Sequence, residues 1–169
     1  MKKNLLAFAL CICIGIVFIA VFIEEEDTPT IHVSYDQIMN GFNSVVSMER
    51  GPVDNPTYRK PNYIGMSSDG SVMIQIIGNK KDVSETSIMI AVPKDDFNMS
   101  NRNMTFLIRF LENVAPNENW GSWINVALNN MITTGKPEVV EKENCLIKLS
   151  PTGSGIFSLV VKPIESIER

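Results

Sequence analysis

The sequence predicts an α+β domain of two layers, an antiparallel β-sheet with helices on one face, preceded by a single transmembrane helix. Three observations predict it. The chain opens with a long apolar run. Apolar residues then recur at helical spacing in three segments, and elsewhere their period changes to two, with turn residues between the runs. The expected order after the transmembrane helix is α-β-β-β-α-α-β-β, with a third late strand as an alternative.

The first apolar run, residues 5–23, contains no charged residue and no proline. At about 1.5 Å per residue, its helix would measure roughly 28 Å, close to the ~30 Å hydrocarbon core of a bilayer. We therefore expect a signal anchor in a bacterial cytoplasmic membrane. Because Lys2 and Lys3 precede it, the positive-inside rule places residues 1–4 in the cytoplasm and the rest of the chain outside, in the periplasm or at the cell surface.

Two processing events are alternatives to a retained anchor. Signal cleavage would release a secreted or periplasmic protein, but it usually requires a small-x-small site, and Ala20–Phe22 ends in a bulky residue. Lipidation requires a small residue before the modified cysteine, and neither Cys11 nor Cys13 follows one.

The part of the chain outside the membrane is acidic. Lys2 and Lys3 precede the apolar run, so 13 of the 15 basic residues and all 19 acidic residues follow it, a balance of −6. Residues 24–31 read as an acidic stalk and residues 32–169 as one domain. This balance argues against nucleic acid or anionic lipid headgroups as a partner. It permits a cationic protein partner, and it also favours solubility.

A first helix is predicted from Ser34, a candidate N-cap that forms a capping box with Gln37. Apolar residues follow at helical spacing, and the helix is expected to end near Met48 because a Gly-Pro pair comes next. The apolar stripe consists of Ile38, Phe42 and Val45.

A proline-punctuated connector follows, in which residues 52, 56 and 61 are prolines. Proline has a fixed φ and no N–H, so this stretch is expected to be a loop. Its segment 55–60 is the predicted binding site, centred on Tyr58, Arg59 and Lys60, because tyrosine and arginine are frequent interface hot spots. The alternative is a structural connector that holds Tyr58 against the domain.

The remaining elements follow from turn residues and periodicity. A hairpin is predicted around Ser68-Asp69-Gly70, and a third strand completes a meander. Two helices come next, the second capped by Asn117 and ended by Gly135. The predicted strands are Tyr63–Ser67, Ser71–Ile77, Glu85–Val92, Val139–Glu141, Cys145–Ser150 and Ile156–Lys162.

Few residues point to chemistry. His32 is the only histidine, so one chain cannot assemble a histidine triad or a two-histidine metal site, and no cofactor or metal is expected. Ser154, between two glycines, reads as part of a hairpin loop rather than a nucleophile elbow. Asp95 and Asp96 are expected near a helix N-terminus, where negative charge is favoured. Cys145, the one cysteine after residue 23, is expected to lie buried in a strand.

Two tryptophans, three residues apart in the last predicted helix, have a structural and a functional interpretation. Trp120 and Trp123 are expected in the core, with a stacking platform for sugar or peptide as the alternative.

These observations favour a non-enzymatic protein-interaction module, anchored by residues 5–23 and facing outward, with another protein as its partner. The alternative is an immunity or inhibitor protein that neutralises a toxin or enzyme in the same compartment. A minor alternative is a hydrolase that uses carboxylates such as Asp95 and Asp96.

Overall fold

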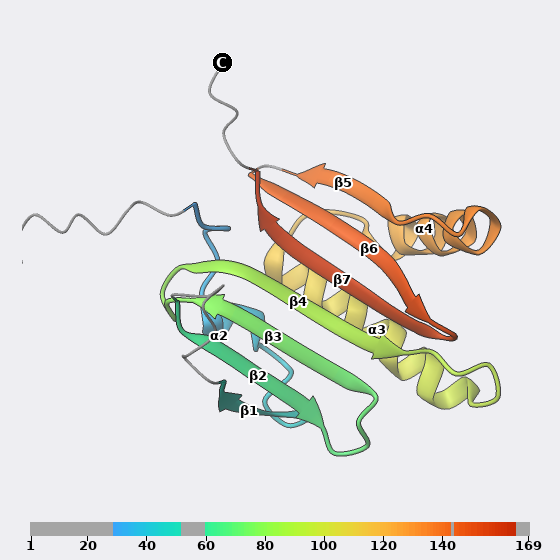
Figure 1. Cartoon of the computed structure of the whole chain (residues 1–169), viewed down its shortest axis with the longest axis horizontal. Coiled ribbons are helices and arrows are strands. Elements are labelled where there is room, and N and C mark those ends of the chain that lie inside the picture. Colours follow the sequence, from blue (N-terminus) through green and yellow to red (C-terminus); the bar gives the residue numbers. More distant parts are fainter. Residues whose placement is uncertain (1–28, 52–59, 143, 165–169) are drawn as a thin grey trace, which may run out of the picture.

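The structure is a computed structural model that describes residues 29–51, 60–142 and 144–164. In chain order its elements are α2 (Tyr35–Ile38), β1 (Val46–Arg50), β2 (Asn62–Ser67), β3 (Val72–Gly78), β4 (Val83–Ala91), α3 (Phe97–Val114), α4 (Trp120–Thr134), β5 (Glu138–Lys142), β6 (Cys145–Gly153) and β7 (Ile156–Pro163). The strands form one antiparallel sheet in the order β1-β2-β3-β4-β7-β6-β5 (Figure 1). The predicted α+β class is confirmed.

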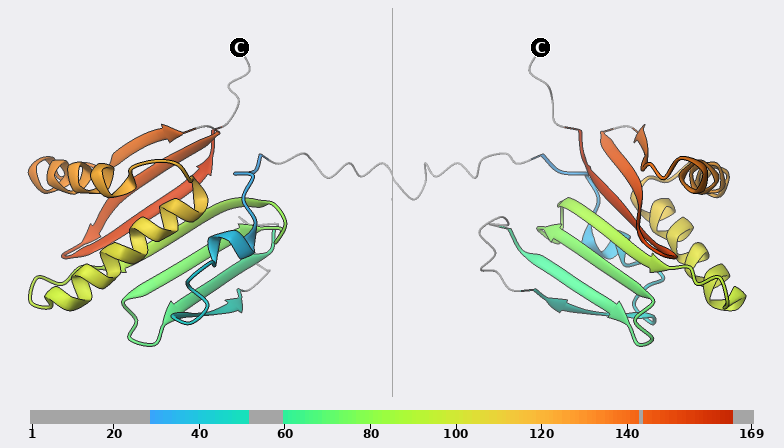
Figure 2. Two further views of the ribbon diagram at one scale, coloured as in Figure 1. Left: turned by 180° about the vertical axis from the view of Figure 1, so that it is seen from behind. Right: turned by 45° about the vertical axis from the view of Figure 1, so that its right-hand side comes forward.

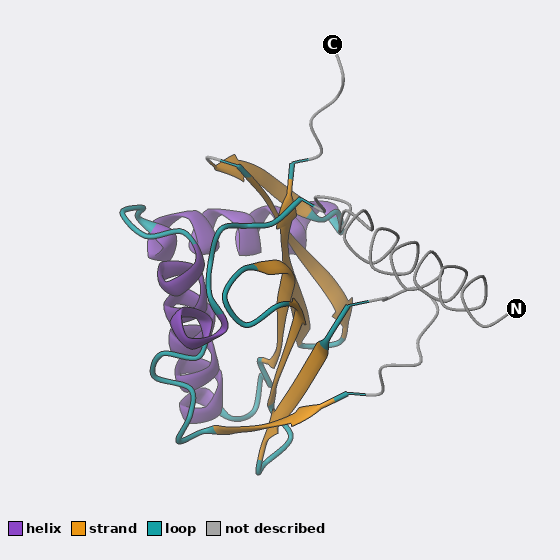
Figure 3. Ribbon diagram, turned by 90° about the vertical axis from the view of Figure 1, so that its left-hand side faces the viewer, coloured by secondary structure: helices purple, strands orange, loops and turns teal. Residues whose placement is uncertain are grey.

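The helices share one side of this sheet. Seen from behind, α2, α3 and α4 all lie in front of the strands (Figure 2). In the edge-on view α3 and α4 form a layer on one side, and no described helix lies on the other (Figure 3). The two-layer arrangement agrees with the sequence prediction.

The core lies between these layers. Alternate side chains of each strand point toward the helices, and a cross-strand row of four apolar residues runs through the middle of the sheet. All four are 0% exposed: Ile74, Ile88, Leu159 and Leu149. The apolar stripe of α3 packs onto them through Leu107, Phe110 and Leu111, which are also 0% exposed. Burying each such side chain stabilises the fold by roughly 1.5–3 kcal/mol.

The prediction of a long first helix is wrong. Ser34 does cap α2 by accepting a hydrogen bond from the Gln37 N–H at 3.2 Å, but the helix ends at Ile38. Gly41 has a φ of +81°, a left-handed conformation that helix residues do not adopt. The chain then turns and Val46 starts a strand, which pairs with β2. Of the apolar stripe that suggested a helix, Ile38 lies in α2, whereas Phe42 and Val45 lie in the turn; Ile38 and Phe42 are buried and Val45 is half-buried.

Smaller corrections concern element number and caps. Four strands rather than three precede α3, because β1 comes before the predicted meander. Three strands follow α4, so the alternative of a third late strand is correct, and that strand is β5. The cap of α4 is Asn119, whose side chain accepts from the Ser122 N–H, and Asn117 has a φ of +71° just before it. Gly135 ends α4 as predicted.

Several predictions fall outside the described residues. These are the membrane helix at residues 5–23, most of the stalk at residues 24–31, and the site residues Tyr58 and Arg59. Within the described ranges, no helix has the length and apolar character needed to cross a bilayer.

Candidate functional site: the open face of the sheet

One face of the sheet has no described helix over it (Figure 3). We call it the open face. Its side chains come from alternate residues of the strands, the ones that do not point into the core. Strand register aligns them in rows that run across the sheet, and two of these rows define the candidate site.

The first row is rich in methionine. Met66 on β2 pairs with Met73 on β3, and Met73 pairs with Met89 on β4, so three thioether side chains lie next to one another. We call these three residues the methionine row. Met66 is 51% exposed, and the other two are half-buried. Methionine is flexible and polarizable, and it is frequent on surfaces that bind partners.

The second row runs beside the methionine row and has opposite charges near its ends. From β1 to β6 it consists of Glu49, Ile64, Gln75, Ser87, Val160 and Lys148. We call it the mixed row. Glu49 and Lys148 are exposed, and the four residues between them are half-buried. The open face therefore has an apolar and neutral centre with an acidic side at β1 and a basic side at β6.

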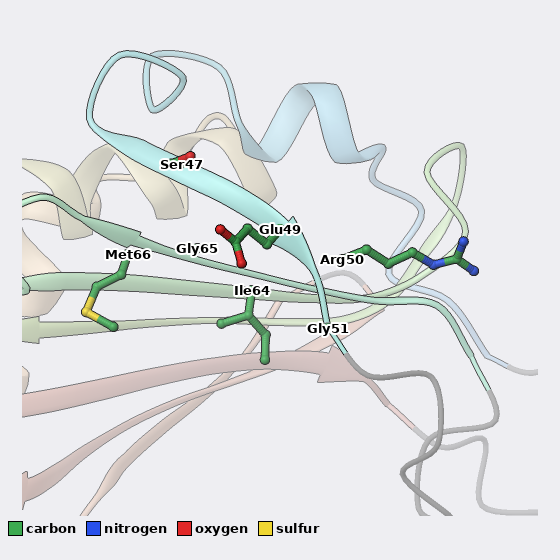
Figure 4. A pocket seen from close by; sticks show the side chains of 7 residues that line it. All are labelled: Ser47, Glu49, Arg50, Gly51, Ile64, Gly65 and Met66. Atoms are coloured by element: carbon green, nitrogen blue, oxygen red, sulfur yellow. The ribbon is translucent and has the colours of Figure 1, made fainter.

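A shallow pocket of about 450 Å³ lies at the β1 end of this face, where β1 meets β2. Figure 4 shows the side chains of Ile64 and Met66 projecting from the same side of β2. The pocket therefore joins the two rows at the edge of the sheet. Its lining residues are Ser47, Glu49, Arg50, Gly51, Ile64, Gly65 and Met66.

Gly65 allows β1 to approach β2 closely at this pocket. A Cβ atom built on Gly65 would contact the Met48 sulfur, and it would lie 2.7 Å from the Val46 Cγ1 and 2.8 Å from the Ser47 carbonyl oxygen. The last of these is a backbone atom, which cannot move without shifting the strand. Glycine is therefore required here for packing between strands.

Lys60 is the one predicted binding residue within the described ranges. Its Nζ donates a hydrogen bond to the Ser84 Oγ at 2.7 Å, which ties the end of the connector to the start of β4. Burial lowers the pKa of Lys60 below its ordinary value. This contact fits a structural role for Lys60. It does not place Lys60 on the open face.

A small aromatic cluster lies near the start of β4, at the end of the sheet where Lys60 bonds to Ser84. The Tyr35 and Tyr63 rings meet edge to face at 5.2 Å between centroids, and the Lys80 Nζ lies 4.7 Å from the centre of the Tyr35 ring. Burial, followed by the charges of Asp36 and Tyr63, raises the pKa of the Tyr35 phenol. The cluster holds the β3–β4 turn against α2, because the Tyr35 N–H also donates to the Lys80 carbonyl.

A polar network at the opposite end of the sheet joins the β2–β3 turn to α3. Asp69 accepts hydrogen bonds from the Ser67 hydroxyl, the Ser71 hydroxyl and N–H, and the Arg102 guanidinium. These bonds, the Ser67 hydroxyl first, hold the pKa of Asp69 well below its usual range. Asn103, 0% exposed, donates to the Ala91 carbonyl beside them. Every member of this network has a structural partner.

The other residues predicted from sequence have structural positions. Asp96 caps α3 by accepting from the Met99 N–H at 2.9 Å, as expected for charge at a helix N-terminus. Ser154 lies between β6 and β7, which confirms the hairpin loop. His32 is exposed, and its Nδ1 lies 3.2 Å from the Thr30 hydroxyl. Cys145 is buried at the start of β6.

Trp120 is buried, as predicted for a core residue, and its indole N–H donates to the Ala115 carbonyl at 2.6 Å. The Trp123 ring meets it edge to face and is half-buried. Within the described ranges, no three His, Cys, Asp or Glu side chains are grouped in a way that could hold a metal ion.

No sequence motif marks the open face, although a signal for its register is present. The hairpin at Ser68-Asp69-Gly70 sets the register of β2 against β3, and this register pairs Met66 with Met73. Comparisons of the chain with protein-family models, with curated proteins and with solved structures found no match.

Proposed function

We propose that this chain is a non-enzymatic protein-interaction module, anchored in a membrane by residues 5–23, which presents its open face to a protein partner outside the cytoplasm. The 19-residue apolar run and the two lysines before it support the anchor and its orientation. The open face supports the interaction role.

The observation that carries the proposal is the methionine row. Apolar side chains on three neighbouring strands form a continuous patch, with Ile64 and Val160 in the adjacent row, on a face that the described helices leave uncovered. Contiguous apolar surface framed by polar residues is typical of binding sites. Ser47 and Ser158 frame the methionine row, as Glu49 and Lys148 frame the mixed row.

Crosslinking of the full-length chain in intact membranes, followed by purification in detergent, tests this proposal. We expect the Met66→Lys variant to lose crosslinked partners, because a charge in the patch must be desolvated on binding. The matched control is Val126→Lys on α4, since Val126 is 57% exposed and Met66 is 51% exposed. Equal loss in both variants, or no loss in either, would contradict a role for the open face.

A second contact is proposed for the connector that ends at Lys60. Tyr58 and Arg59 combine large contact area with directed hydrogen bonds, and flanking prolines reduce the entropy lost on docking. The Tyr58→Ala/Arg59→Ala double variant is expected to bind the partner less tightly at an unchanged melting temperature. A lower melting temperature with binding retained would show that these residues only hold the connector.

The acidic balance of −6 supports a narrower version, in which the module is an immunity or inhibitor protein for a cationic toxin or enzyme. The gene next to this one would then encode a secreted toxin. A gene placed among housekeeping functions would count against this version and leave the interaction role intact.

A further inference from the structure

We infer that the partner of the open face is a second copy of this chain, so that two sheets pack face to face about a two-fold axis parallel to the strands and between β3 and β4. This inference rests on the proposed function, because it names the occupant of the same surface. Charge complementarity carries it. The two ends of the mixed row have opposite signs, Glu49 on β1 and Lys148 on β6.

The strand order determines which residues would meet. A two-fold axis between β3 and β4 brings β4 opposite β3 of the other copy, β7 opposite β2, and β6 opposite β1. Glu49 of each copy then faces Lys148 of the other, which forms two equivalent charge pairs at the rim. An axis moved by one strand in either direction does not bring these two residues together.

The same axis matches the centre of the face. In the methionine row, Met73 of one copy lies opposite Met89 of the other. In the mixed row, Ile64 lies opposite Val160, and Gln75 lies opposite Ser87. At these positions apolar residues meet apolar residues and polar residues meet polar residues, whereas Met66 lies opposite Ser158. Flexible methionine side chains can interdigitate between two sheets packed about 10 Å apart.

The size of the face suits a dimer. Six strands, from β1 to β6 in sheet order, face a counterpart across this axis. Spaced about 4.8 Å apart and each contributing about five residues of 3.4 Å, they give a flat footprint of roughly 500 Å². Side chains roughen this surface, so the accessible area buried approaches the ~800 Å² per partner of a standard stable interface. Tethering both copies in one membrane by residues 5–23 would raise their effective concentration further.

Charge reversal tests the axis. The full-length chain in mild detergent is studied by light scattering, with the detergent mass subtracted. We expect a dimer, whose dissociation constant rises at least about tenfold in either Glu49→Lys or Lys148→Glu, because each variant places like charges opposite each other twice. The double variant Glu49→Lys/Lys148→Glu restores the pairing, and its dissociation constant is expected within about threefold of the wild type.

Matched reversals on the helix side provide the control. Glu112→Lys on α3 and Lys94→Glu in the loop before it change the net charge by the same amounts at exposed positions away from the open face. They are expected to leave the dissociation constant unchanged. Melting temperatures of all variants separate a weakened interface from a weakened fold.

Cysteine crosslinking gives an independent readout. In one chain, Glu49 and Lys148 lie five strand spacings apart, roughly 24 Å, whereas facing positions of the two packed sheets lie about 10 Å apart. In the Glu49→Cys/Lys148→Cys variant, a bismaleimide reagent with a reach of about 10 Å is therefore expected to link two chains rather than two cysteines of one chain. Each single variant should give little of this product.

The inference is overturned if the wild-type chain is monomeric, if neither single reversal weakens the dimer, or if the dicysteine variant does not crosslink. A dimer insensitive to both reversals would mean that another segment holds the copies together. If the wild-type chain is monomeric and Met66→Lys abolishes crosslinking to a different protein, the open face does not bind a second copy of this chain. That result would still support the proposed interaction role.

Discussion

The two faces of the sheet are built from the same strands, yet they differ in how deeply their side chains are buried and in which residues pair across strands. On the covered face, Ile74 pairs with Ile88, and both are 0% exposed under α3. One residue away on the open face, Met73 pairs with Met89, and both remain half-buried. The covered face holds the domain together, whereas no described helix packs on the open face.

The largest expected effect is on the covered face. Ile88→Ala should lower the free energy of unfolding by about 2–5 kcal/mol, because it leaves a cavity under the helices. Met89→Ala, its neighbour on the open face, should cost less than about 1.5 kcal/mol, because water can fill the space. Chemical denaturation of both variants measures the difference. Equal losses would mean that the open face is packed as tightly as the core.

The next effect concerns the close contact between β1 and β2 at Gly65. Gly65→Ala is expected to cost about 1–3 kcal/mol, because the new Cβ overlaps β1 at Val46 and the Ser47 carbonyl. Crosslinked partners should fall as well, since β1 forms one wall of the pocket. Gly70→Ala, in the turn after β2, is the control. A Cβ atom at Gly70 would lie near the Met66 sulfur alone, at 3.8 Å, so this variant should not displace β1. It should still be less stable than wild type, because Gly70 has a φ of +69° that alanine rarely adopts.

A smaller effect is expected from pH at the Asp69 network. The pKa of Asp69 is below its ordinary value of 3.8, so its stabilising contribution is fully present above that value. The contribution is lost as the pH falls through the folded pKa. Asp69→Asn should therefore be less stable than wild type at pH 6, and the two melting temperatures should converge toward pH 2. A constant gap across this range would mean that the carboxylate charge is not the cause.

The smallest effect should come from Met73→Leu. The two side chains have similar volume, so stability is expected to change by less than about 0.5 kcal/mol. Partner crosslinking should fall only slightly, since leucine keeps the apolar surface but not the flexibility of methionine. A loss as large as that of Met66→Lys would show that the sulfur itself makes a specific contact.

Local signals predicted the later elements correctly for identifiable reasons. The Ser68-Asp69-Gly70 turn defines its hairpin, and Gly135 marks the end of α4. The prediction of a long first helix was wrong because the apolar residues between 38 and 45 have helical spacing. The Asn40-Gly41 pair within this range is a turn signal. Apolar spacing alone cannot distinguish a long helix from a short helix followed by a turn that buries the same residues.

Unlike the elements of the fold, the candidate site has no local signature in the sequence. Lys60, the one predicted binding residue within the described ranges, has a local partner, because it donates a hydrogen bond to Ser84. The open face has no motif. It consists of ordinary residues on separate strands, and only strand pairing brings them into rows.

By itself, the sequence determined the α+β class, the apolar run, the acidic balance and most of the turns, because each depends on neighbouring residues. Only the tertiary structure decided that β7 pairs with β4 and that β6 lies beyond β7. This order places Lys148 and Glu49 in one row, near opposite edges of the sheet. Pairing between distant strands depends on how the whole core packs and not on local propensity. For that reason the methionine row and the charged ends of the mixed row exist only in the folded chain.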